Sequence, residues 1–341
     1  MSAKTGIQWC DSTFNPVIGC TKISPGCDGC YAAAQDKFRK WTPEGWGGPR
    51  KRTSVSNWKE PVKWNSGQFY QCSHCGMRGT ASAFANPCAH GRGGVHWLQA
   101  ARRRVFCASL ADVFDNQWDP QWRADLFDLI AQTPNLDWLL LTKRIGNAKP
   151  MINEAISRLR LGGWKQMPWP WPNVWIGATV VNQEEADRDI PKLLAINAYV
   201  RFLSMEPLLG RVDLCEHLGM WWNQTMGCFE STGPTFNSKG PTGQQHPGIG
   251  WVIAGGESGP GARPSQPEWY RSLRGQCDGA SVPFLFKQWG EFAPLTAFPP
   301  SFGTDAARIV ASHDGGPAMY RAGKKAAGRL LDGVEHNGFP M

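Results

Sequence analysis

Short apolar runs that end in polar residues recur along the chain, and helix-like stretches follow them. After the first run, Leu126, Leu129 and Ile130 recur at helical spacing. The strands predicted from the runs span residues 104–110, 138–144, 174–180, 200–207, 251–257 and 282–288. The helices predicted between them span residues 121–132, 151–161, 184–195 and 268–277. Apolar strands that alternate with helices are typical of a parallel sheet covered on both faces, so we expect an α/β fold.

Polar residues gather where the predicted strands end, and in such folds the carboxyl ends of the strands line the active site. These residues are Ser109, Asp112, Thr142, Lys143, Arg144, Ser204, Glu206, Gly255, Gly256, Glu257, Lys287 and Gln288. Core packing alone does not explain charge at the same end of several strands. For the Lys143–Arg144 pair and for Glu206 the alternative is a surface ion pair, and for the glycines it is an ordinary tight turn.

Three segments interrupt the pattern and set the predicted domain organisation. Residues 1–294 are expected to form one α/β domain. It would contain an inserted segment, residues 41–96, rich in Gly, Trp, Cys and basic residues, and a mobile loop at residues 220–248. Residues 295–341 form a basic Pro/Gly-rich tail that either wraps the domain or contacts a partner.

The 341-residue chain contains no run of about 20 apolar residues, and its first residues lack the apolar core of a signal peptide. We therefore expect no membrane association and a cytoplasmic location. In that reducing compartment disulfides are rare, so clusters among the 11 cysteines indicate metal binding or catalysis.

Cys20, Cys27 and Cys30 lie in one Pro/Gly-rich loop directly before a helix-like segment. Such a loop can aim three thiolates at different irons of a 4Fe–4S cluster and leave one iron open for S-adenosylmethionine. A structural zinc site is the alternative, although zinc takes four ligands and the loop offers three without a nearby histidine. The spacing alone leaves both open.

A second group, Cys72, Cys75, Cys88 and His90, has the spacing of a zinc knuckle. We predict that it binds Zn²⁺, with His74 and His96 as substitutes for His90. The alternatives are an auxiliary iron–sulfur cluster and a surface insertion without any ligand.

The net charge of +8 favours an anionic partner, of which nucleic acid is the commonest. The 18 tryptophans are many for this length, and exposed ones could stack on bases. The sequence therefore predicts a nucleic acid or nucleotide substrate.

The chain resembles phage- and prophage-associated proteins of uncharacterised function that carry a three-cysteine motif. The segments that match are residues 5–9, 15–16, 19–31, 141–144, 173–177, 201–208, 255–259 and 286–290. The family is similar to radical S-adenosylmethionine enzymes, which implies a partial (β/α) TIM-like barrel with a 4Fe–4S cluster at the carboxyl ends of its strands. This favours the cluster over zinc on Cys20, Cys27 and Cys30. Two features differ from the usual radical motif: the first cysteine gap is longer, and the Gly-Gly-Glu segment comes late in the chain.

These observations together predict a radical enzyme that modifies or repairs a nucleic acid or nucleotide. The expected catalytic residues are Asp112, Lys143, Glu206 and Lys287. The expected cofactor-binding residues are Ser109, Thr142, Ser204, Gly255, Gly256 and Glu257. An electron donor and a partner protein are further expected partners. The rival hypothesis is a non-catalytic nucleic-acid-binding protein stabilised by two zinc sites. A third hypothesis is an enzyme that uses S-adenosylmethionine for ordinary methyl transfer, but the sequence lacks the Gly-rich loop that such an enzyme has after its first strand.

Overall fold

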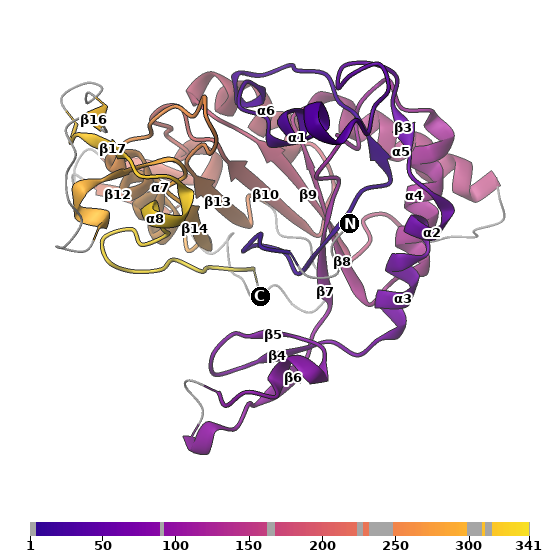
Figure 1. Ribbon diagram of the computed structural model, residues 1–341, viewed down its shortest axis with the longest axis horizontal. Helices are drawn as coiled ribbons and strands as arrows, with labels where there is room; N and C mark the ends of the chain where they lie inside the picture. The colour runs from indigo at the N-terminus through magenta and orange to yellow at the C-terminus, as the bar shows by residue number, and fades with distance from the viewer. Residues whose placement is uncertain are drawn as a thin grey trace.

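A curled, fully parallel sheet of seven strands forms the centre of the molecule (Figure 1). The computed structural model describes residues 5–88, 92–161, 168–223, 228–231, 248–298, 309–310 and 316–340. The strands of the sheet, in spatial order, are β1 (Ser12–Phe14), β7 (Arg103–Cys107), β8 (Leu136–Thr142), β9 (Val174–Thr179), β10 (Val200–Met205), β13 (Trp251–Gly255) and β14 (Phe284–Gln288). Their spatial order follows the chain order, as in one side of a (β/α) barrel.

Helices cover the outer face of this half-barrel sheet. They are α4 (Pro120–Gln132), α5 (Ile145–Leu161), α6 (Gln183–Leu194) and α7 (Pro267–Gly279). Polar caps set where two of them begin: Asp119 accepts a hydrogen bond from the Gln121 amide at the start of α4, and Asn182 accepts one from the Glu185 amide at the start of α6. The α/β prediction, its six strands and its four helices are thus confirmed to within a few residues at most ends.

The inner face of the sheet is filled by side chains and not by helices, which differs from the predicted cover on both faces. Alternate strand residues point inward, because side chains alternate between the two faces of a strand. They form a cluster whose members include Phe106, Trp175, Phe202 and Trp251. The terminal segments complete it: the Trp9 ring lies 4.5 Å from that of Phe106, and the Phe339 ring lies 4.9 Å from that of Trp251.

The predicted insertion does not behave as one unit. Residues 41–66 pack on the barrel through β3 (Lys51–Arg52), α2 (Val55–Trp58) and α3 (Glu60–Ser66); β3 pairs with β2 (Val17–Ile18), and Trp64 joins the main core. Residues 67–88 and 92–101 form a separate projection, here called the lobe (Figure 1). Its three-stranded sheet contains β4 (Tyr70–Cys72), β5 (Arg78–Gly79) and β6 (Leu98–Ala100).

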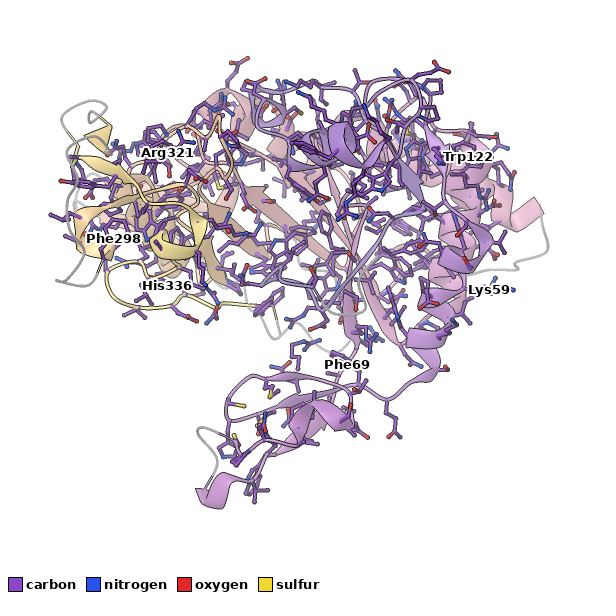
Figure 2. The ribbon with its side chains drawn as sticks, viewed as in Figure 1. Lys59, Phe69, Trp122, Phe298, Arg321 and His336 are labelled. Carbon is purple, nitrogen blue, oxygen red and sulfur yellow. The ribbon has the colours of Figure 1, made fainter. Side chains whose placement is uncertain are left out.

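The lobe joins the barrel at the amino end of β7. Its two ends are held together by a hydrogen bond from the Ala101 amide to the Phe69 carbonyl, 2.9 Å long. Phe69 lies at this junction (Figure 2), where the Arg103 guanidinium sits 4.9 Å from its ring centre. The lobe therefore lies at the opposite end of the sheet from the carboxyl ends of the strands.

The tail returns to the sheet. β15 (Phe292–Pro294), β16 (Ile309–Val310) and β17 (Met319–Arg321) form a small antiparallel sheet, and α8 (Lys324–Ala327) follows. Residues 336–338 then pair along β14: the Phe286 amide donates to the His336 carbonyl, and the Gly338 amide donates to the Phe284 carbonyl. Of the predicted mobile loop, β11 (Met220–Asn223) and β12 (Cys228–Ser231) form a hairpin, and most of the remainder lies outside the described residues.

Among the described residues, no helix combines the length and apolar character needed to cross a bilayer. The first α-helix of the chain, α1 (Tyr31–Arg39), directly follows the first cysteine group.

Asp137, near the amino end of β8, gives a first prediction. Burial raises the pKa of its carboxyl to about 6, although Arg102, Arg104 and Arg78 oppose the shift. The folded state therefore holds more protons than the unfolded state between pH values of about 4 and 6, and stability falls as pH rises through that window. Asp137→Asn removes this dependence. We expect urea unfolding to show that the free energy of unfolding of the variant rises relative to that of the wild type by about 3 kcal/mol between pH values of about 4 and 7. A difference that does not change with pH contradicts the assignment.

Candidate functional site

A cavity of about 300 Å³ opens at the carboxyl ends of the strands. That volume lies at the lower end of the range for small-molecule sites. The cavity is bounded by strand ends, by the loop that carries the first three cysteines, and by α8 from the tail. Predicted site residues on its lining are Cys20, Cys27, Cys30, Ser109, Asp112, Thr142, Lys143, Ser204, Glu206, Gly256, Glu257 and Lys287. Gly255 is not among the lining residues.

The cysteine loop takes its shape from a short 3₁₀ turn, Pro25–Cys27. Ser24 caps this turn by accepting a hydrogen bond from the Gly26 amide, 3.0 Å long. The Cys30 amide then donates to the Cys27 carbonyl at 3.2 Å, and α1 begins at the next residue. The turn buries Cys27 and leaves Cys20 and Cys30 half-buried at the cavity wall.

Arg263 fastens this loop to the barrel. Its Nε and Nη2 atoms each donate to the Glu257 carboxylate at 2.8 Å, and Nη2 also donates to the Pro25 carbonyl at 2.8 Å. The fit is close, because a Cβ on Gly29 would lie 2.4 Å from Glu257 Oε1. The Glu257 carboxylate is therefore engaged by Arg263, and its clearest role is to hold the cysteine loop in place.

Arg144 connects the loop to the neighbouring strand ends. Its Nη1 atom lies 3.4 Å from Cys20 Sγ and 3.4 Å from Asp112 Oδ2, while Nη2 donates to the Thr21 carbonyl at 2.8 Å. Burial raises the pKa of the Cys20 thiol to about 11; the Asp112 charge adds to the shift and Arg144 opposes it. Arg144 is thus the cation that favours a thiolate at Cys20.

Asp112 is saturated by hydrogen bonds from its own chain. Its carboxylate accepts from Thr142 Oγ1 at 2.6 Å, from the Lys143 amide at 3.0 Å and from the Phe114 amide at 3.0 Å, in addition to the Arg144 contact. A carboxylate with these partners is poorly placed to take a proton from a ligand. The geometry makes Asp112 a positioning residue for the end of β8.

Beneath the loop lies a buried ion pair between Arg50 and Asp115. Their side chains are 1% and 0% exposed, and Arg50 Nη2 lies 2.7 Å from Asp115 Oδ2. Arg50 Nη2 also donates to Thr21 Oγ1 at 2.6 Å. Arg50 and Arg144 therefore hold Thr21, the residue after Cys20, from two sides.

Glu206 and Lys287 form an ion pair on the cavity wall. Lys287 Nζ lies 2.7 Å from both carboxylate oxygens of Glu206, and Gln288 Nε2 donates to one of them at 3.3 Å. The side chains of the pair are 16% and 14% exposed, for Glu206 and Lys287 respectively. This pair retains access to the cavity, and it can offer a bound group both a donor and an acceptor.

Lys143 and Lys324 bring ammonium groups to the cavity without a carboxylate of their own. Lys143 Nζ has a weak contact with Thr179 Oγ1 at 3.5 Å. Within the described part of the chain, neither ammonium lies within 4.0 Å of a carboxylate. Burial lowers the pKa of Lys324; the Lys287 charge lowers it further and Glu206 opposes this. An anion in the cavity would meet two unpaired positive charges.

The Gly-Gly-Glu segment has a packing role. A Cβ on Gly256 would lie 1.8 Å from the Trp289 carbonyl oxygen, so only glycine fits where β13 and β14 end side by side. Close approach of the backbone to a ligand is not required to explain this residue.

The second cysteine group lies in the lobe, far from the cavity. The ligand atoms of Cys72, Cys75, Cys88 and His96 all lie within 4.8 Å of one another, so this group could hold a metal ion. Among the described residues, the histidine that lies with the three cysteines is His96, one of the two predicted substitutes. His90, the predicted ligand, lies outside the described residues.

Sequence reasoning missed Arg50, Arg263, Thr179 and Lys324. Thr179 ends a predicted strand and carried the same signal as Ser204. The others reach the cysteine loop or the cavity from distant parts of the chain, and no spacing rule marks them.

A family model described as a protein of unknown function (DUF5131) matches residues 4–340. No curated protein and no solved structure matches the chain.

Proposed function

The chain belongs to the DUF5131 family of proteins of unknown function, and we propose that it is an iron–sulfur enzyme of the radical S-adenosylmethionine type that acts on a nucleic acid or nucleotide. The observation that carries the proposal is the shared lining of one cavity. Cys20, Cys27 and Cys30 meet the polar ends of the parallel strands there, although those strand ends come much later in the chain.

The donor set suits a cluster. Three cysteine sulfurs are the ligands of a 4Fe–4S cluster that keeps one iron open. A single zinc ion takes four ligands on one atom, whereas a cluster spreads its thiolates over different irons, and this loop brings three sulfurs to the cavity. When bound, the cluster would supply the electron that cleaves the carbon–sulfur bond of S-adenosylmethionine.

The chain's own residues hold and shape this site. Arg263 and Glu257 fix the cysteine loop, and Arg144 and Asp112 fix the segment around Cys20. Ser204 lines the cavity beside the Glu206–Lys287 pair and can hydrogen-bond an amino or carboxylate group. These contacts would orient a cofactor and a substrate side by side.

The substrate class follows from charge. Lys143 and Lys324 are unpaired in the cavity among the described residues, and the whole chain carries a net charge of +8. Both features suit a phosphate-bearing ligand. Two versions of the reaction fit: a lyase that reverses a DNA lesion, and an enzyme that installs a modified base. A phage or prophage origin and a cytoplasmic location, with an electron donor and a partner protein, belong to the same proposal.

The test is iron content and cofactor cleavage in protein prepared and reconstituted without oxygen. Reduced protein should cleave S-adenosylmethionine and release methionine. Protein that holds about four irons per chain yet leaves the cofactor intact contradicts the radical chemistry.

The alternative is a non-catalytic nucleic-acid-binding protein stapled by zinc. The metal-ready group in the lobe favours it. It leaves the three cavity cysteines and the polar strand ends without a purpose. Zinc without iron after anaerobic reconstitution would support this alternative.

Lys324→Gln should weaken binding of a nucleoside monophosphate about tenfold, because the variant loses a charged contact to the phosphate. Lys325→Gln is the matched control, since Lys325 is the next residue and does not line the cavity. Isothermal titration calorimetry at fixed salt measures both. Equal affinities for the two variants contradict a phosphate contact at Lys324.

A further inference from the structure

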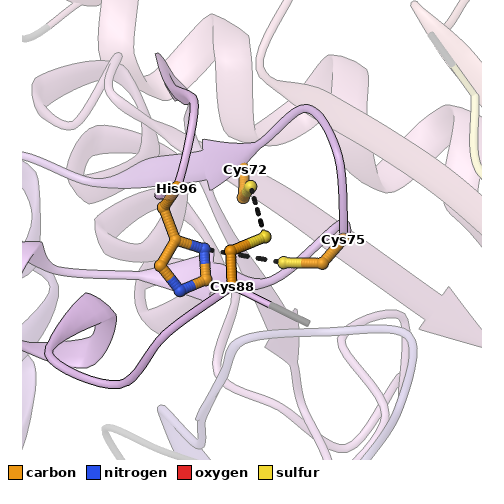
Figure 3. A group of neighbouring side chains, drawn as sticks. All are labelled: Cys72, Cys75, Cys88 and His96. Atoms are coloured by element: carbon orange, nitrogen blue, oxygen red, sulfur yellow. Dashed lines mark hydrogen bonds between the residues drawn. The ribbon is translucent and has the colours of Figure 1, made fainter. Parts of the chain in front are cut away.

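Four ligand atoms converge in the lobe (Figure 3). Cys72 ends β4 and Cys75 lies in the turn to β5, while Cys88 and His96 come from the segment that precedes β6. Cys72 and Cys88 are buried, and Cys75 and His96 are half-buried. The lobe stands at the amino end of β7, so this group is separate from the cavity.

Two distances match the edges of a zinc tetrahedron. Zinc binds sulfur at about 2.3 Å and nitrogen at about 2.0–2.1 Å, so tetrahedral angles place two sulfurs about 3.8 Å apart and a sulfur and a nitrogen about 3.5 Å apart. Cys72 Sγ lies 3.8 Å from Cys88 Sγ. Cys75 Sγ lies 3.6 Å from His96 Nδ1. A disulfide would need sulfurs about 2.05 Å apart, so Cys72 and Cys88 do not form one.

Contacts behind the ligands hold this geometry. His96 Nε2 lies 2.9 Å from the Asn86 carbonyl, which makes Nε2 the protonated nitrogen and leaves the Nδ1 lone pair for a metal. The Gly76 amide donates to the Cys72 carbonyl at 2.9 Å and closes the turn that carries Cys75. The Cys88 amide donates to the Gly94 carbonyl at 2.7 Å. These hydrogen bonds orient the ligand set.

The lobe has almost no apolar core. Cys72 and Cys88 are the buried apolar side chains among its described residues. Phe69 and Phe84 are only half-buried, and four other large apolar side chains are exposed: Met77 by 39%, Val95 by 60%, Trp97 by 60% and Leu98 by 41%. A unit of this size cannot fold by hydrophobic burial on so little, and small domains of this kind use a metal instead.

We infer that Cys72, Cys75, Cys88 and His96 bind one Zn²⁺ ion, and that this ion keeps the lobe folded. Three thiolates and one imidazole are a closed structural zinc set with no open position for catalysis. The inference does not depend on the proposed function, because the ligands are all in the lobe and the proposed cluster is in the cavity.

The test measures zinc per chain by mass spectrometry of the metals in the full-length protein, in the Cys20→Ala/Cys27→Ala/Cys30→Ala background. We expect one zinc per chain in that background. His96→Ala should lose the zinc to a chelator at least tenfold faster than the protein with His96 intact. His96→Cys should retain the zinc. His74→Ala and His90→Ala are the matched controls and should keep the metal. Zinc that stays in His96→Ala, or that is lost in His90→Ala instead, overturns the ligand set.

Trypsin supplies a second readout. Removing the zinc should expose cleavage after Arg78 and Arg92, both within the lobe, with no change at Lys51 and Arg52 on the barrel. This also separates local unfolding of the lobe from failure of His96→Ala to fold. If the metal-free lobe resists trypsin as well as the zinc-loaded lobe does, the ion does not hold it together. Iron in the lobe in place of zinc also overturns the inference.

Discussion

Cys20→Ala/Cys27→Ala/Cys30→Ala is expected to abolish iron binding. Wild-type protein reconstituted without oxygen should hold about four irons per chain and absorb visible light, since thiolates carry the cluster. The variant should hold none, and its cleavage of S-adenosylmethionine should fall to background. The fold should survive, because Cys20 and Cys30 are only half-buried and the loop keeps its Arg263 anchor. Iron analysis, the visible spectrum and methionine release measure the effect.

Cys215→Ala/Cys277→Ala is the matched control. Both thiols are buried in the main core, away from the cavity, so the control removes cysteines without touching the loop. It should retain full iron. Iron that persists in the triple variant contradicts the assignment of the cluster to this loop, and a wild type that takes up zinc but no iron contradicts the cluster itself.

Asp115→Asn should destabilise the protein by about 3–5 kcal/mol, because it leaves the buried Arg50 guanidinium without its counter-charge. The Asp115 and Arg50 side chains are 0% and 1% exposed, so water cannot take the place of the lost carboxylate. Arg50 also holds Thr21, so the damage should spread to the cysteine loop. Urea unfolding measures the loss.

Asp125→Asn is the control for this variant. Asp125 pairs with Arg52 at 2.5 Å, but their side chains are 32% and 36% exposed, and such surface pairs contribute less than about 1 kcal/mol. A similar loss in both variants would mean that the Arg50–Asp115 pair is no stronger than a surface contact.

The half-barrel was predictable because its strands are continuous apolar runs, and such runs at regular intervals leave few alternatives to a parallel sheet. β1 was missed for the opposite reason. Ser12–Phe14 is three residues long and mostly polar in sequence, and it becomes a buried strand only by pairing with β7. The inner face could not be predicted either, since Phe339 must return from the tail, 88 residues after Trp251, to pack against its ring.

The cavity lining was predictable to the extent that it sits on strand ends. Ser204, Glu206 and Lys287 follow directly from strand position and polarity. The roles were harder to predict: Glu257 was expected to bind a cofactor, and in the structure its carboxylate accepts two hydrogen bonds from Arg263. The hydrogen bond from Arg263 to the Pro25 carbonyl, which lies 238 residues earlier in the chain, has no local sequence signal. The lobe shows the same limit. The sequence spacing identified the three cysteines, whereas the histidine that lies with them among the described residues, His96, is evident only from the structure.

The pairing of residues 336–338 along β14 bears on self-association. A sheet that does not close into a barrel leaves two edges, and an exposed edge is a template for strands from other copies. Here the chain occupies the β14 edge itself, through the Phe286–His336 and Gly338–Phe284 hydrogen bonds. The other edge, β1, is three residues long, too short to seed a stack. An open half-barrel can thus remain dispersed at high concentration, where an uncovered edge would nucleate aggregates.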